Sequence, residues 1–75
     1  MEKEKDIFYF IKEGNVKGVE SRLSEADKVK EGITPLQLAR RELDKVPMEN
    51  DEYTQAEIER RERIVSMLEN EENRY

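Results

Sequence analysis

Apolar residues recur at helical spacing along most of the chain, and this pattern predicts four helices. The first is expected from about residue 4 to residue 13, because Ile7, Phe10 and Ile11 fall at i, i+3 and i+4 and share one helix face. Gly14 is expected to end this helix, since glycine adopts the left-handed cap conformation without a steric penalty.

A second helix is predicted directly after Asn15, whose side chain can accept a hydrogen bond from a backbone N–H of the first turn. Its apolar residues recur at i, i+3 and i+7, and they are Val16, Val19 and Leu23. Gly18 lies inside this helix, where glycine costs about 1 kcal/mol relative to alanine. It either permits the close approach of a neighbouring helix or is there by chance. The first and second helices form a predicted pair over residues 4–25.

The third helix is expected to begin at Thr34, within the segment GITPLQLARRE. The Thr34 side chain can accept from the backbone N–H of Gln37, and the Gln37 side chain can reach back to Thr34, which is the reciprocal capping box. Pro35 suits the first helical position, where its missing N–H is not needed. The apolar stripe that follows consists of Leu36, Ala39, Leu43 and Val46. Leu38 lies off this stripe, so it either contacts a second neighbour or is exposed.

Pro47 is expected to end the third helix, because a proline disfavours the helical conformation of the residue before it. An acidic loop follows. Thr54 is then expected to begin the fourth helix, with Glu57 as its partner in a second capping box. This helix should reach about residue 70, with an apolar stripe made of Ile58, Val65 and Leu68. The third and fourth helices form a second predicted pair over residues 34–70.

No segment shows the alternation of a strand, so the predicted fold class is all-α, in one domain that spans residues 1–75. The short connections favour two antiparallel helix pairs, and a small four-helix bundle is the alternative arrangement. Val29, in the link between the pairs, is expected at the edge of the core.

The composition narrows the class of partner. The chain has 75 residues, of which 44% are charged and 35% apolar, and its net charge is −5. An acidic domain is repelled by phosphate backbones and anionic lipids, so neither nucleic acid nor a membrane is expected as a partner. No apolar run approaches the ~18 residues needed to span a bilayer, and the charged start MEKEKD does not resemble a signal peptide. A cytoplasmic location is expected.

The residue types of the chain argue against catalysis and against metal binding. The chain has no cysteine and no histidine, which removes thiolate ligands and the commonest general base. Most carboxylates fall on predicted exposed faces beside Lys or Arg, rather than in the differently tuned pairs that acid–base catalysis uses. The acidic loop at 49–52 lacks the spacing of a calcium site. We therefore expect no enzyme activity, no cofactor and no metal.

Three segments of the chain share sequence features with a known repeat family. GITPLQLA at 32–39 is similar to the G-x-T-P-L-H-x-A sequence of ankyrin repeats, with Gln37 in place of the usual histidine. EGNVKGVESRL at 13–23 resembles the segment that joins the two helices of a repeat, and ERIVSMLEN at 62–70 resembles the second helix of a closing repeat. The segment between the pairs is shorter than the family's period of ~33 residues implies, and an insertion follows LARREL. The resemblance implies stacked helix pairs that bind another protein.

The candidate partner-binding residues come from two arguments. A helix cannot point all of IFYF (7–10) at one core, so Phe8 or Tyr9 with a neighbour is expected on a flank, where aromatic residues often anchor interfaces. Ile33 is expected to be exposed in the turn before the third helix. The resemblance implies that this turn and the adjacent helix face line the recognition surface. The residues that it adds are Lys30, Glu31, Gln37 and Arg41.

The basic clusters at 40–41 and 60–63 allow two interpretations. They form either a patch for an acidic partner or ion pairs along the helices, such as Glu57 with Arg61 at i, i+4. The function expected overall is non-catalytic binding of a partner protein. One alternative is a structural domain that self-associates through the aromatic first helix into a homo-oligomer. Another is a small acidic inhibitor that masks a basic surface.

Overall fold

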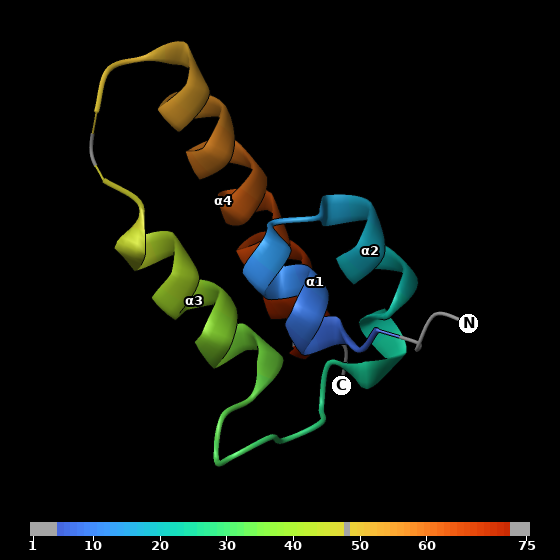
Figure 1. Ribbon diagram of the computed structural model, residues 1–75. Helices are drawn as coiled ribbons and strands as arrows, with labels where there is room; N and C mark the ends of the chain where they lie inside the picture. The colour runs from blue at the N-terminus through green and yellow to red at the C-terminus, as the bar shows by residue number, and fades with distance from the viewer. Residues whose placement is uncertain (1–4, 48, 73–75) are drawn as a thin grey trace.

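The computed structural model describes residues 5–47 and 49–72, and this part of the chain is helical with no strand (Figure 1). The elements are α1 (Ile7–Glu13), α2 (Val16–Ser21), the short 3-10 helix η1 (Leu23–Glu25), α3 (Pro35–Lys45) and α4 (Glu52–Glu72). The predicted all-α class is therefore confirmed. No helix in the described ranges is long and apolar enough to cross a lipid bilayer.

The helices form two antiparallel pairs that pack against each other. The α3–α4 pair forms a long hairpin, and the shorter α1–α2 pair lies against it (Figure 1). Within this arrangement α1 contacts α3, and α2 contacts α4. Each helix of the first pair therefore stacks on the helix at the corresponding position of the second pair.

The first helix begins at Ile7, so the start expected near residue 4 is wrong. Asp6 is extended and caps the helix, because its carboxylate accepts the backbone N–H of Tyr9 at 3.0 Å. The Ile7 N–H donates to the Glu25 carboxylate at 3.3 Å, which satisfies a second free donor of this first turn. The C-terminal end is as predicted: Gly14 has a φ of 71° and closes the helix in the left-handed conformation.

Gly18 settles the choice left open by the sequence. A Cβ atom at this position would lie 2.3 Å from Cδ1 of Phe10, much closer than carbon atoms approach without displacement. The Phe10 ring of α1 therefore packs directly on the backbone of α2 at Gly18. Only glycine permits this distance, so Gly18 serves the close approach of the two helices.

The third helix begins as the sequence predicts. Thr34 accepts the Gln37 N–H at 3.2 Å, and the Thr34 N–H donates to the Gln37 side chain at 3.0 Å. Leu38 is buried, so it contacts a second neighbour rather than solvent. This follows from the position of α3, which packs on both α1 and α4.

The fourth helix begins at Glu52, and the capping box predicted for Thr54 and Glu57 is wrong. Asp51 caps instead: one carboxylate oxygen accepts the Thr54 N–H at 2.7 Å, and the other accepts the Thr54 hydroxyl at 3.0 Å. A carboxylate is a stronger acceptor than a hydroxyl, and the cap therefore lies at Asp51, three residues before the predicted cap at Thr54. The helix also continues past residue 70 to Glu72.

The core lies where the two pairs meet. Its buried apolar residues are Ile7, Phe8, Ile11, Val19, Leu36, Leu38, Ala39, Ile64 and Leu68. Val29 is not among them, because it lies in the exposed link between η1 and the turn at 30–33, with 64% of its surface exposed. The prediction that it covers the core edge is wrong.

Candidate functional site

A groove lies between α1, the turn at 30–33 and one face of α3, and we call it the α1–α3 groove. Its volume is about 290 Å³. Five of the seven residues selected from the sequence line it, namely Phe8, Lys30, Glu31, Ile33 and Arg41. The lining is completed by Lys12, Leu38, Glu42 and Lys45. Residues from separate parts of the sequence thus meet at one hollow.

One wall of the groove is a tight two-residue turn. The backbone N–H of Lys30 donates to the carbonyl of Ile33 at 2.9 Å, and the Ile33 N–H donates back at 3.0 Å. The two residues between them, Glu31 and Gly32, both have positive φ, at 54° and 78°. This is the backbone of the type I′ turn, which fixes where the side chains of Lys30 and Ile33 emerge.

Phe8 forms part of the groove's floor, so of the two candidates for the exposed flank, Phe8 and Tyr9, it is Tyr9 that lies there. Only 6% of the Phe8 surface is exposed, because α1 turns this side chain toward α3 and the core. The Lys30 ammonium lies 5.8 Å from the ring centroid and covers part of the ring. Ile33, expected to be exposed, is half-buried and packs against the core. The residues of the apolar floor therefore also pack in the core, and only part of their surface is open to a ligand.

The rim of the groove is charged, and its cations differ in how they are paired. Lys30 lies 3.4 Å from the Asp6 carboxylate, and Lys45 lies 3.3 Å from the Glu42 carboxylate. The hydrogen bond from the Tyr9 backbone, together with Lys30, lowers the pKa of Asp6 and keeps this carboxylate charged. The Lys30–Asp6 pair thus joins the turn to the start of α1, whereas the Glu42–Lys45 pair lies within α3.

Two of the selected residues lie outside this groove. Gln37 is exposed, but its side-chain oxygen accepts the Thr34 N–H as part of the helix cap. Tyr9 is 40% exposed, with the Lys5 ammonium 4.5 Å from its ring centroid and the Phe10 ring in edge contact at 5.5 Å. Tyr9 is thus the flank residue among the aromatics of α1, on a different side from Phe8.

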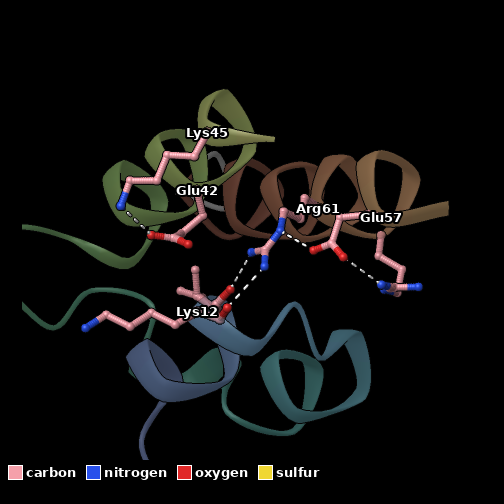
Figure 2. A network of polar contacts seen from close by, with 7 residues as sticks. Lys12, Glu42, Lys45, Glu57 and Arg61 are labelled. Atoms are coloured by element: carbon pink, nitrogen blue, oxygen red, sulfur yellow. Dashed lines mark hydrogen bonds and ion pairs between the residues drawn. The ribbon is translucent and has the colours of Figure 1, made fainter. Parts of the chain in front are cut away.

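Arg61 fixes the end of α1 beside the groove, as Figure 2 shows. Its Nη1 donates to the carbonyl of Ile11 at 2.9 Å, and its Nη2 donates to the carbonyl of Lys12 at 3.1 Å. Its Nε donates to Glu57 at 2.7 Å, so the predicted Glu57–Arg61 pair is confirmed. A Cβ atom at residue 14 would lie 3.3 Å from Arg61, so Gly14 also leaves room for the guanidinium.

The position of Arg61 in the sequence is itself a signal that its side chain is buried. Arg61, Ile64 and Leu68 fall at i, i+3 and i+7, and the structure buries all three. An arginine on the apolar stripe of a helix needs hydrogen-bond acceptors inside the protein. The carbonyl groups at the end of α1 are these acceptors, and each lies about fifty residues earlier in the sequence.

The groove provides recognition chemistry: an apolar floor, a charged rim and a turn with a fixed backbone. Among the described residues, Asp6 and Asp51 are the two carboxyl groups with a lowered pKa, and both owe it first to backbone hydrogen bonds at helix starts. No group of His, Cys, Asp or Glu side chains in the described part of the chain is arranged to hold a metal ion.

Comparison with known proteins adds no relative. No protein-family model matches the chain, and no curated protein or solved structure matches it significantly. The ankyrin resemblance therefore rests on the three segments at 13–23, 32–39 and 62–70, and the function has to be argued from the groove.

Proposed function

We propose that this protein is a non-catalytic binding module of ankyrin-like type, which holds a partner protein in the α1–α3 groove. The observation that carries the proposal is the convergence of Phe8, Lys30, Glu31, Ile33 and Arg41 on one hollow. Three of these come from the turn that resembles the family's recognition turn, and the others come from the two helices beside it.

The stacking of the helices supports the ankyrin-like part of the proposal. In a stack of helix pairs, the first helices of successive pairs lie together, as do the second helices. Here α1 lies on α3 and α2 lies on α4. A binding surface built from the first helices and the turn before α3 is therefore continuous across both pairs.

The rigidity of the groove favours binding as its role. The turn at 30–33 is closed by two backbone hydrogen bonds, and the last turn of α1 is tied to α4 by Arg61. A surface that is already ordered loses less conformational entropy when a partner binds.

Self-association through the aromatic first helix receives less support. Ile7, Phe8 and Ile11 are buried in the core, and Phe10 packs on Gly18. Tyr9 is then the one aromatic residue of α1 with substantial exposure in the structure's described part, which is little for a stable apolar interface.

An affinity purification with matched charge variants tests the proposed function. Lys12→Glu with Arg41→Glu reverses two rim charges, and Lys17→Glu with Arg63→Glu reverses two exposed charges on α2 and α4. We expect the wild type and the second pair to retain the same protein from a cell extract, and the first pair to lose it. Retention of that protein by all three baits would contradict the proposal.

A further inference from the structure

We propose that the α1–α3 groove binds an acidic segment of the partner protein, with one apolar side chain on the groove floor and carboxylates at its rim. This inference rests on the proposed function and adds the chemistry of the partner. It follows from the sign of the groove's charge, from the pairing of its cations and from the shape of its floor.

The groove is locally basic in an acidic protein. It is lined by four cations and two acids, with the cations at 12, 30, 41 and 45 and the acids at 31 and 42. The formal balance is therefore 4 − 2 = +2, while the whole chain carries −5. Basic residues gathered in a hollow raise the local positive potential, which attracts a ligand of opposite sign.

Two of these cations are available to a ligand. Lys30 and Lys45 are paired with Asp6 and Glu42, respectively. The side chains of Lys12 and Arg41 are exposed, and neither side chain has a hydrogen-bond or ion-pair partner among the described residues. They come from α1 and α3, the two helices that form the groove, so a carboxylate between these helices meets charge from either one.

The position of Lys12 is set by the fold rather than by its own charge. Its main-chain carbonyl accepts from Arg61, while its side chain extends away from Arg61 (Figure 2). The neighbouring ion pair between Glu42 and Lys45 lies on α3 across from it (Figure 2). Arg61 thus anchors the backbone that presents the Lys12 ammonium, and the ammonium remains free for a partner.

The floor has room for an apolar side chain but not for a large ligand. Phe8, Ile33 and Leu38 supply apolar surface in a hollow of about 290 Å³. This is at the lower limit of ~300 Å³ for pockets that hold small molecules. A peptide side chain with flanking carboxylates fits this combination of a small apolar floor and a cationic rim.

The lining argues against a nucleic acid as the occupant. Glu31 and Glu42 interrupt the positive charge, and the net charge of −5 repels a long phosphate backbone. A second copy of this chain offers an acidic segment at 49–52, beside Tyr53, which is 80% exposed. Both occupants are outcomes that the experiment below distinguishes.

The test selects peptides of about 12 residues from a random displayed library against the wild-type domain, a length that spans a groove of this kind. Three variants serve as comparison: Lys12→Glu with Arg41→Glu, Lys12→Gln with Arg41→Gln, and the Lys17→Glu with Arg63→Glu control. Circular dichroism confirms that each is folded. All altered side chains are exposed, so their removal leaves the core intact.

We expect the selected peptides to be rich in Asp and Glu around one apolar residue. Their affinity should fall at least about tenfold in the Glu variant, less in the Gln variant and little in the control, and it should weaken as salt screens the charges. Selection of neutral or basic peptides, or of none, would overturn the inference. So would tighter binding of a single-stranded oligonucleotide, or a wild-type dimer that the Glu variant abolishes.

The two proposals fail in different ways. If affinity purification depends on the groove but the selected peptides are not acidic, the binding function stands and the acidic partner is wrong. If neither the affinity purification nor peptide binding depends on Lys12 and Arg41, both proposals are wrong.

Discussion

The Nη2 of Arg61 donates a hydrogen bond to the main-chain carbonyl oxygen of Lys12 at 3.1 Å, and so ties α4 to the last turn of α1. The same guanidinium donates to the carbonyl of Ile11 and to Glu57, and only 9% of the residue is exposed. Carbonyl groups at the end of a helix lack partners within the helix. Arg61 supplies such a partner to the Lys12 carbonyl, and it adds a second donor to the Ile11 carbonyl, which also accepts the Gly14 N–H.

Replacing Arg61 with alanine should lower the free energy of unfolding by about 2–4 kcal/mol, because it removes three hydrogen bonds at a buried position. The Lys12 carbonyl loses its donor, while the Ile11 carbonyl keeps the Gly14 N–H and the half-buried Glu57 keeps Arg60. Arg60→Ala is the matched control. Arg60 pairs with the same Glu57 at 3.1 Å but is largely exposed, so its loss should cost at most about 1 kcal/mol. Urea denaturation measures both values. Equal losses of stability in the two variants would show that the hydrogen bonds from Arg61 to α1 do not stabilise the protein.

Replacing Gly18 with alanine should destabilise the protein by about 1–3 kcal/mol, although alanine favours helix formation. The reason is the 2.3 Å approach of the added Cβ to the Phe10 ring. Removing the ring in the double variant Gly18→Ala with Phe10→Ala should eliminate this extra cost. A double-mutant cycle by thermal or urea unfolding measures the coupling. Additive losses would mean that the ring and the glycine do not interact.

Replacing Glu31 with asparagine should stabilise the protein by about 0.5–1 kcal/mol, because asparagine followed by Gly32 suits a turn with two positive φ angles. Asp27→Asn makes the same charge change at an exposed position without positive φ. The difference in urea midpoint between the two variants isolates the backbone effect. An equal increase in the urea midpoint of both variants would show that the stabilisation comes from the change in charge and not from the backbone.

The stability should fall in acid because two helix caps lose their charge. Backbone hydrogen bonds lower the pKa values of Asp6 and Asp51 below 3.8 in the folded protein. Their contribution is therefore complete above pH 3.8 and is lost as the pH falls through the lowered folded values. Asparagine also caps helices but does not titrate in this range. The double variant Asp6→Asn with Asp51→Asn should lose less stability than the wild type between neutral pH and pH 3.

The exposed Asp44 of α3 provides the control for this pH series. It caps no helix, so Asp44→Asn should leave the acid dependence of the unfolding free energy close to that of the wild type. If the double cap variant shows the same acid dependence as the wild type, the two caps do not account for it.

The parts of the fold that depend on neighbours in the sequence could be predicted, and the start of α3 is the clearest case. Thr34 and Gln37 satisfy each other's backbone groups within one turn, so no distant residue is needed. The start of α4 was mistaken because both Asp51 and Thr54 are good caps, and the capping-box pattern favoured the threonine. The Asp51 carboxylate accepts two hydrogen bonds from Thr54 at once, and the capping-box pattern takes no account of this.

The candidate site depended more on contacts between distant segments. The turn residues Lys30, Glu31 and Ile33 were selected because the ankyrin resemblance implies that this turn lines a recognition surface, and all three line the groove. The burial of Phe8 could not be predicted from the sequence, since it depends on where α3 packs against α1. Arg61 donates to carbonyl groups that lie about fifty residues earlier in the sequence. Of its partners, only Glu57 lies on the same helix, so only that bond could be predicted from nearby residues.

The central claim is that the α1–α3 groove receives the partner, and backbone amide chemical shifts of the labelled protein test it most directly. The ligand is the protein that co-purifies with the wild type. We expect the largest shift changes at residues 8–12, 30–33 and 38–45, which form the groove. Changes centred on α2 and the exposed face of α4, with the groove amides unaffected, would contradict the claim.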